Sequence, residues 1–530
     1  MKKSYFVITI LLAVSLTFSG VVGFSAQEPK QGGTLNVAIS YGDPSTLDPH
    51  LSSSITSNQV IEQIFDGLIA IEPGTLEIKP EVAKNWIASA DGKTYWFKLR
   101  KGVKFHNGTE LTASDFKYSA ERIGDPDFAS PEIDLIVLMK GAREYMDGEA
   151  EEISGITVID KYTLKIELTE FSPAFLYGLC TLDIVPKEVA EEKGEDFTNN
   201  PIGSGPFKFE KWRRGSEIQL SAFEDYYAGR PYLDKLNFKV MIEPGARQAA
   251  FDSKGVDFMI ADGPMYEKYK KMPKSKVKLL TCAEFFTRNM IFNLDHEPLS
   301  NKKVRQAINY AIDSKAIIDN VLRGKAIPAV GWLPSSSPAF NEDLKGYPYD
   351  PEKAKQLMKE AGYEDGVTIT VMARKGGGGA WGTRAVEAAM PYLKEIGVKV
   401  NMQVRESGTA NTKAGQGDFK AYMYSQGGYV SPFRYLNTYF HSETERIAGN
   451  YWNYSNPEVD KLLDKAQQTT DYNERMEILG EVDAIITEDA PSWFYNYNKA
   501  VAVVQPWVHG LKANPRDNAY HDYDKVWIEK

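Results

Sequence analysis

The amino-acid sequence predicts an α/β protein built from more than one lobe, and three observations support this. The chain has 530 residues, whereas a domain holds about 150, so roughly three units are expected. Hydrophobic residues make up 42% and charged residues 25%, which is ordinary for a soluble globular protein. Strand-like and helix-like stretches alternate without a repeat, and no linker rich in Pro, Gly and Ser separates the halves. Lobes that share crossing strands fit this pattern better than independent domains on a tether.

The N-terminus has the layout of a secretory signal peptide. Lys2 and Lys3 precede an apolar stretch at 5–18, and small residues follow up to Gly23-Phe24-Ser25. We expect residues 1–25 to be this signal. An uncleaved membrane anchor is the weaker alternative, because Ser, Thr and Gly interrupt a stretch that is barely long enough to span a bilayer.

The number and positions of the cysteines bear on the protein's cellular compartment and on whether it can form a disulfide bridge. Cys180 and Cys282 are the two cysteines of the chain, and the first 30 residues contain none. A bacterial lipoprotein needs a cysteine just after its signal, so we predict a freely diffusing periplasmic protein. An oxidising compartment permits a bridge between the two thiols, but its geometry is strict. Two free buried thiols are the default expectation.

The first half of the mature chain shows strand, helix and hairpin signals in order. Residues 34–40 follow two glycines and predict a strand, and apolar residues at helical spacing predict a helix within 58–69. Two β-hairpins are predicted at 156–169 and 206–223, each with polar turn residues between apolar strands.

The second half is richer in helices. The apolar spacing predicts a helix at 301–322. Asp350-Pro351 and Asn456-Pro457 each place a capping residue before a proline at the first helical position. Another helix is expected at 472–488, and the glycine run at 376–379 predicts a mobile loop.

Charge and motifs exclude several functions. The formal charge of −10 argues against nucleic acid, which requires clustered Lys and Arg. The six histidines are scattered, with no pair at metal-ligand spacing and no His-Glu-x-x-His. A Ser-x-x-Lys at 275–278 lies among lysines and lacks its companion motifs. We therefore predict no enzyme activity, no cofactor and no metal site.

Several blocks are similar to the bacterial extracellular solute-binding proteins of family 5, which include oligopeptide- and dipeptide-binding proteins. Residues 81–122 carry the most specific resemblance, and a capping box at Thr112 to Asp115 opens a helix within them. The other matching blocks occur in family order over nearly the whole mature chain: 32–50, 201–212, 292–318, 349–363, 456–467, 488–498 and 503–510.

The resemblance implies a two-lobed periplasmic-binding-protein fold (type II, cluster C) with an extra subdomain in the first lobe and a hinged cleft. Ligand would favour the closed form, which contacts it from both sides, and an ABC permease with its ATPases would recognise that form. The implied boundaries are lobe I at 26–75, 200–285 and 499–530, the inserted subdomain at 76–199, and lobe II at 286–498, with crossing strands near 280 and 500.

The resemblance also places the ligand. In peptide-binding members an extended peptide pairs with short strands of both lobes, and the matching segments here are 53–55 and 424–429. Such members usually hold the ligand's ammonium with an aspartate in the second segment. Gly428 or Tyr429 occupies that place, and no Asp or Glu occurs from Phe419 to Ser442. An enclosed ammonium without a counter-charge costs several kcal/mol.

Three interpretations of this departure stay open. Another acid such as Glu406 or Asp418 serves, or the peptide's amine is blocked or exposed to solvent, or the ligand is an oligosaccharide or a metal chelate. Aromatic residues could stack on sugar rings, and Arg384 and Arg434 could hold a carboxylate in bidentate fashion; each aromatic could equally be packed in the core. The aromatic candidates are Trp381, Tyr422, Tyr424, Tyr429, Phe433 and Tyr435.

We expect a monomer that binds a peptide-like ligand, with an oligosaccharide or a metal chelate as the alternative within the family. An extracytoplasmic enzyme or a chaperone is the alternative of a different class. The predicted ligand-binding residues are Ser53, Ser54, Ile55, Trp381, Arg384, Tyr424, Ser425, Gln426, Gly428, Tyr429, Phe433 and Arg434.

Overall fold

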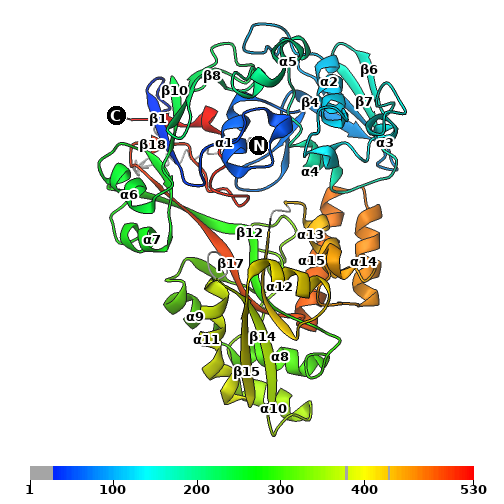
Figure 1. Cartoon of the computed structure of the whole chain (residues 1–530), viewed down its shortest axis with the longest axis vertical. Helices are drawn as coiled ribbons and strands as arrows, with labels where there is room; N and C mark the ends of the chain where they lie inside the picture. The colour runs from blue at the N-terminus through cyan, green and yellow to red at the C-terminus, as the bar shows by residue number, and fades with distance from the viewer. Residues whose placement is uncertain (1–27, 376–379, 428–429, 530) are drawn as a thin grey trace, which may run out of the picture.

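The protein has an upper and a lower body joined at a waist in the computed structural model (Figure 1). The structure describes residues 28–375, 380–427 and 430–529. The predicted signal peptide and the glycine run at 376–379 therefore lie outside the described residues. No helix in the described ranges has the length and apolarity needed to cross a membrane.

An 11-stranded mixed sheet runs through both bodies. Its lower part consists of β15 (Val398–Arg405), β14 (Val367–Arg374) and β16 (Ala421–Gly427). Its upper part consists of β11 (Phe258–Ile260), β1 (Thr34–Ile39), β10 (Lys235–Val240), β9 (Glu217–Ala222) and β8 (Phe207–Arg213). The predicted strand at 34–40 and the predicted hairpin at 206–223 are thus confirmed.

Two long strands connect the bodies, at the positions where the family resemblance implies crossing strands. β12 (Lys278–Phe292) and β17 (Ser492–Val504) pair antiparallel from Lys278↔Val504 to Ile291↔Ser492. Their register shifts between Ala283 and Thr287 and again between Arg288 and Asn289. Such irregularities bend a ladder and increase its twist, so the waist is where these strands depart from regular geometry.

A separate four-stranded sheet builds the right-hand part of the upper body (Figure 1). Its strands are β4 (Ala83–Ala88), β5 (Thr94–Leu99), β7 (Thr163–Glu167) and β6 (Ile156–Asp160), and the last two form the predicted hairpin at 156–169. α2 (Ala113–Gly124) begins at the predicted capping box of Thr112 and Asp115 and buries Phe116 and Ile123 in a core of its own. This unit lies within the predicted subdomain; the domain boundaries themselves stay predictions.

The remaining elements of the upper body are short. The helices are η1 (Pro49–Leu51), α1 (Ile55–Ile64), η2 (Ile133–Leu135), α3 (Ala142–Met146), α4 (Phe175–Leu179), α5 (Lys187–Lys193), η3 (Gly194–Thr198), α6 (Pro244–Asp252), α7 (Gly263–Tyr269) and η6 (Tyr523–Lys525). The strands are β2 (Ile69–Ile71), β3 (Ile78–Pro80), β18 (Val508–His509) and β19 (Trp527–Ile528).

The prediction of one helix within 58–69 is wrong in its bounds. α1 begins at Ile55 and ends at Ile64, where Phe65 has extended backbone and its N–H closes the last turn on Ile61. The apolar residues beyond the helix, such as Leu68, are buried in the adjoining subdomain core. Their helical spacing therefore reflected burial and not a continuing helix.

The lower body is mostly helical, and two of its helices start at the N-cap residues predicted from the sequence. α10 (Pro351–Glu360) and α14 (Pro457–Gln468) start as predicted, with Asp350 and Asn456 as N-caps, and α15 (Tyr472–Asp489) confirms the last helix. The predicted single helix at 301–322 is wrong, because Ile312 has extended backbone and Asp313 caps a second helix. The other elements are α8 (Lys302–Ala311), α9 (Ser314–Val321), α11 (Ala380–Glu395), α12 (Ser407–Gly415), α13 (Pro432–Phe440), η5 (Arg446–Ala448) and β13 (Ala326–Pro328).

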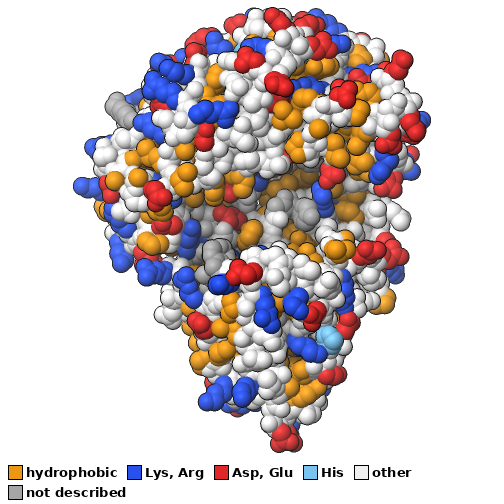
Figure 2. Space-filling view, viewed as in Figure 1, with side chains coloured by type: hydrophobic (Ala, Val, Ile, Leu, Met, Phe, Trp, Pro, Cys, Tyr) orange, Lys and Arg blue, Asp and Glu red, His pale blue; other side chains and the backbone are white. Residues whose placement is uncertain are grey.

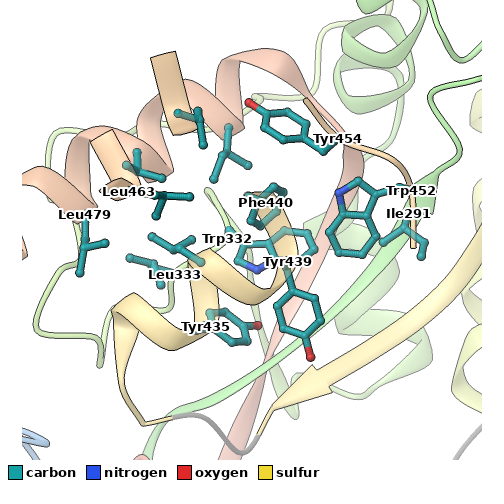
Figure 3. Packing of buried hydrophobic residues seen from close by; sticks show 14 of the residues in the cluster. Ile291, Trp332, Leu333, Tyr435, Tyr439, Phe440, Trp452, Tyr454, Leu463 and Leu479 are labelled. Atoms are coloured by element: carbon teal, nitrogen blue, oxygen red, sulfur yellow. The ribbon is translucent and has the colours of Figure 1, made fainter. Parts of the chain in front are cut away.

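An aromatic core fills the lower body between α13, α14 and α15 (Figure 3). The fully buried ring of Trp332 lies 4.6 Å from Phe440 and 5.3 Å from Trp452 between centroids. Asp483 of α15 accepts the backbone N–H of Trp332 at 2.8 Å, and its burial raises the pKa of that carboxyl to about 7. This core anchors α13, which forms one wall of the cavity described below.

Candidate ligand-binding site

A cavity of about 510 Å³ lies between the two bodies. Figure 2 shows a hollow at the waist of the molecule. The upper body lines the cavity with Ile71, Asp134, Leu135, Val137, Leu138, Ser172, Ala174, Phe175, Tyr177, Gly178, Thr181 and Arg516, and the lower body with Val430, Ser431, Phe433, Arg434, Asn437 and Thr438. The volume suits a small organic ligand, and mostly apolar walls with a few polar groups are typical of such sites.

α13 forms the lower wall of this cavity. Ser431 caps the helix by accepting the N–H of Arg434 at 3.3 Å, and Pro432 occupies the first helical position. Phe433 is 7% exposed and belongs to the aromatic core, whereas Arg434 is exposed at the cavity. The two predicted site residues therefore differ: Phe433 mainly anchors the wall, whereas Arg434 is exposed on it, and its contact with a ligand stays a prediction.

The carboxyl ends of β14, β15 and β16 face the waist, because β14 runs parallel to both neighbours. In open α/β sheets, ligands bind outside the carboxyl ends of the strands. Tyr424, Ser425 and Gln426 lie at this end of β16. All three are among the ligand-binding residues predicted from the sequence.

One edge of β16 is unpaired near the waist. The strand pairs with β12 along its whole length, from Ala421 to Gly427. On the other side it pairs with β14 only at Ala421 and Tyr422. From Met423 to Gly427, that edge has no strand partner in the described part of the chain. Such an edge is a template for pairing with another extended chain.

The side chains at this end of β16 are held from both sides. Arg374, the last residue of β14, donates from Nη2 to the Ser425 hydroxyl at 2.8 Å. Tyr424 packs against Tyr451, with ring centroids 5.2 Å apart. Gln426 is 3% exposed, and its amide nitrogen and oxygen have no hydrogen-bond partner among the described residues. Gly428 and Tyr429, also predicted site residues, lie outside the described residues.

The upper-body segment of the predicted site is not a strand. Ser54 caps α1 in extended conformation and Ile55 is the first residue of that helix, so the expected pairing strand at Ser53 to Ile55 is corrected. Ser53 is exposed and Ile55 is 41% exposed, so both can still be reached by a ligand.

A buried ion pair fixes this segment to the subdomain. Arg122 of α2 donates to both Asp48 oxygens, Nη1 to Oδ1 at 2.9 Å and Nη2 to Oδ2 at 2.5 Å. Its Nη1 also lies 3.0 Å from His50 Nδ1, so that nitrogen accepts and Nε2 donates to the Asp183 carbonyl at 2.9 Å. Burial, reinforced by the Arg122 charge, lowers the pKa of His50 to about 4. The imidazole is therefore neutral at pH 7.

Trp381 and Arg384 at the start of α11 lie on the opposite face of the crossing strands from α13. Trp381 is half-buried, stacked 6.4 Å from Tyr495, with the Arg288 guanidinium 5.2 Å from its ring centroid. Arg384 is exposed and does not line the cavity. A ligand contact at Arg384 stays a prediction.

The acids proposed from sequence to replace the missing aspartate lie elsewhere. Glu406 and Asp418 are exposed and form ion pairs with Lys375 and Lys413. Neither lines the cavity. Asp134 does, from a single 3-10 turn in the subdomain. No sequence pattern marks a lone acid in such a turn, so Asp134 was not predicted.

Several predicted stacking aromatics are core residues. Tyr422 and Tyr435 are fully buried, and the Tyr435 hydroxyl lies 2.8 Å from Thr287 Oγ1. Cys180 and Cys282 are free thiols, as the default expectation had it, but both are half-buried and not fully buried. In the described ranges, no group of three or more His, Cys, Asp or Glu is arranged to hold a metal ion.

Two bodies joined by two strands, with a ligand-sized cavity between them, define a two-lobed solute-binding protein. Residues 77–446 match the model of the bacterial extracellular solute-binding proteins, family 5 (middle region), and the chain belongs to this family. It is a substrate-binding protein and not an enzyme.

Relatives and solved structures agree with this assignment. The chain is 29% identical to the dipeptide-binding protein of Escherichia coli (93% of this chain, 94% of that one). It is 30% identical to heme-binding protein A of Haemophilus influenzae (89% and 88%). The structure of the periplasmic murein tripeptide-binding protein MppA in its unliganded open form superposes with a TM-score of 0.84 at 26% identity (94% and 97%). The DppA protein of Helicobacter pylori in complex with the peptide STSA gives 0.68 at 27% identity (94% and 99%). The predicted periplasmic-binding-protein fold is confirmed.

Proposed function

We propose that this protein is the periplasmic substrate-binding subunit of an ABC importer, and that it captures an extended peptide-like ligand between its lobes and delivers it to the permease. The protein acts as a monomer, because each chain contains both walls of the cavity. Peptide-binding relatives support the ligand class.

The unpaired edge of β16 carries this proposal. Between Met423 and Gly427 the strand offers backbone donors and acceptors to the waist, and an extended peptide matches them by strand addition. Oligosaccharides have no repeating amide groups for such an edge.

The aromatic rings also favour a peptide over a sugar. A sugar-stacking site needs an accessible ring face. Tyr422, Phe433 and Tyr435 are buried in the core, and Trp381 is half-buried, stacked on Tyr495 with the Arg288 guanidinium 5.2 Å from its ring centroid.

Asp134 is placed to receive the ligand's ammonium group. It is the acid in the described lining of the cavity, and it comes from the subdomain and not from lobe II. Arg516 on the same wall is engaged by Glu62 at 2.6 Å and lies over the Tyr520 ring at 4.0 Å. The relocated acid explains how the segment after β16 can lack an aspartate.

The lobes close on the ligand. The chain superposes better on the unliganded open MppA structure than on the DppA–peptide complex, with TM-scores of 0.84 and 0.68 at nearly equal identity. This supports an open state in which Asp134 is exposed. A ligand bound by both lobes shifts the population toward the closed state.

Native mass spectrometry of the protein purified from its producing cells tests the ligand class, combined with thermal-shift screening of peptide and oligosaccharide pools. Co-purified peptides, or stabilisation by peptides alone, are expected. Stabilisation by neutral oligosaccharides alone would contradict the peptide assignment and identify the ligand class as a sugar.

A further inference from the structure

We propose that the upper body contains a second ligand site, separate from the interlobe cavity, that binds a small organic cation carrying one ammonium group. Asp66 and Glu81 hold the ammonium, and Tyr226 and Tyr227 form the wall beside it. We call this the ammonium site. It goes beyond the proposed function and does not depend on what the interlobe cavity binds.

The ammonium site is a cavity of about 390 Å³ that lies wholly within the upper body. Its walls come from α1 and the residues just after it, from β3 and the residue that follows it, and from the chain segments 226–228, 510–512 and 521–525. It shares no lining residue with the interlobe cavity. Pockets for small molecules have volumes of about 300–1,000 Å³, so this cavity can hold a small organic ligand.

Two of the acids that line this cavity have no ion pair. Asp66 comes just after α1 and Glu81 just after β3, and neither carboxylate pairs with a basic residue in the described part of the chain. The other lining acids are each paired: Glu62 with Arg516, Glu72 and Asp522 with Lys79, and Asp524 with Lys525. A buried carboxylate without a counter-charge is costly, so these two acids call for a cationic partner.

The Asp66 carboxyl also lacks a hydrogen-bond donor. The residue is 2% exposed, and its Oδ1 accepts a hydrogen bond from the Tyr226 hydroxyl at 3.3 Å. Its Oδ2 is buried and has no hydrogen-bond partner among the described residues. The Ser204 hydroxyl favours the charged form of Asp66 but does not reach hydrogen-bond geometry with it. Buried polar atoms are nearly always hydrogen-bonded, so an acceptor left open in a cavity wall points to a donor from a ligand.

Glu81 lies beside Asp66. Its Oε2 accepts the backbone N–H of Gly67 at 2.7 Å, and Gly67 directly follows Asp66 in the chain. The two carboxyls therefore lie at one end of the cavity. A primary ammonium has three N–H donors, so a single such group can reach both acids.

The surrounding charges favour a bound cation. Burial raises the pKa of both carboxyls, and the charge of Asp66 adds to this shift at Glu81. Asp183, Asp522 and Asp524 raise these pKa values further, whereas Lys79 and the hydrogen bond from Tyr226 oppose the rise. The empty pair therefore retains a proton near neutral pH. A bound ammonium stabilises the charged forms and so releases that proton.

Tyrosine rings supply the apolar part of the wall. Tyr226 and Tyr227 both line the cavity, with ring centroids 4.7 Å apart and planes tilted by 55°. The Arg100 guanidinium already lies 5.7 Å from the Tyr227 ring centroid, which leaves Tyr226 as the ring for a ligand cation. Aromatic rings attract organic ammonium groups through the negative faces of their π-systems.

The basic residues in the wall limit the ligand to one positive charge. Lys79, Arg100, Lys512 and Lys525 also line the cavity, and a polyamine would place its further ammonium groups next to them. A divalent metal ion does not fit, because no group of three or more His, Cys, Asp or Glu in the described ranges is arranged to hold one. A monoamine with a short chain meets both conditions.

Isothermal titration of the purified protein with n-propylammonium chloride tests the proposal, with 1-propanol as the neutral probe and calcium chloride as the metal probe. Saturable binding is expected for propylammonium alone, and titrations in two buffers of different ionisation enthalpy should show proton release. Asp66→Asn should weaken propylammonium binding at least tenfold and abolish the proton release. Asp225→Asn is the matched control and should change neither, because Asp225 is an exposed acid outside the cavity lining that pairs with Lys104.

The outcomes separate the ammonium site from the interlobe cavity. Asp134→Asn should bind propylammonium as the wild type does, and a loss of binding there would place the ammonium in the interlobe cavity and overturn the second site. Equal binding of 1-propanol, binding of calcium ions that Asp66→Asn abolishes, or no binding of propylammonium would each overturn it as well. If Asp66→Asn fails to fold by circular dichroism, Glu81→Gln decides: wild-type affinity and proton release in that variant would count against the site.

Discussion

Removing Arg122 should destabilise the upper lobe and weaken ligand binding together. The Arg122 and Asp48 side chains are 8% and 1% exposed and form a bidentate pair. Arg122→Met would leave the Asp48 carboxylate buried without its counter-charge. Breaking a buried pair by removing one partner costs about 3–5 kcal/mol. His50 Nδ1 would also lose its hydrogen-bond donor. We therefore expect the loss of unfolding free energy to lie in the upper part of the range of about 3–5 kcal/mol.

The assay is urea unfolding of the ligand-free protein, followed by tryptophan fluorescence, for Arg122→Met, Asp48→Asn and the double variant. Because the two residues are in direct contact, the double variant should cost less than the sum of the single ones, by at least about 1 kcal/mol. Affinity should also fall, since the pair fixes the segment that leads to Ser53 and Ser54. A loss below about 1 kcal/mol in Arg122→Met, or strict additivity, would refute this reasoning.

Three further predictions concern binding, packing and pH. Asp134→Asn should weaken the binding affinity for peptides with a free amine about tenfold, measured by titration, and leave the affinity for N-acetylated peptides unchanged. Equal losses of affinity for both kinds of peptide would contradict an ammonium contact. Trp332→Ala should lower the free energy of unfolding of the lower lobe by about 3–5 kcal/mol, measured by urea unfolding, and a change within error would contradict the packing argument. The pKa of Asp483 is raised from 3.8 to about 7, so the folded state retains a proton that the unfolded state loses, and stability should fall by up to about 4 kcal/mol as pH rises through this window. Asp483→Asn should remove that part of the pH dependence in thermal unfolding, and an identical profile would exclude Asp483 as its source.

The sequence predicted the local features of the fold well because they depend on a few neighbouring residues. The caps at Thr112, Asp350 and Asn456 start helices as expected. The helix predicted at 301–322 was wrong because its apolar spacing continues across the extended residue Ile312. Apolar periodicity reports burial, and two consecutive helices on one core can share it.

The candidate site was partly predictable. β16 was located through the family resemblance, and Tyr424 to Gln426 lie at its carboxyl end; their contact with a ligand stays a prediction. Asp134 could not be found from sequence. It reaches the cavity only because the subdomain folds against the lower lobe.

Hydrogen–deuterium exchange with and without a bound peptide tests the central claim most directly. Strand addition between the lobes predicts slower exchange in fragments that cover 423–427 and also in upper-lobe fragments that cover 133–138 and 172–178. Protection limited to one lobe, or protection that spares the β16 edge, would contradict an extended peptide held between the two lobes.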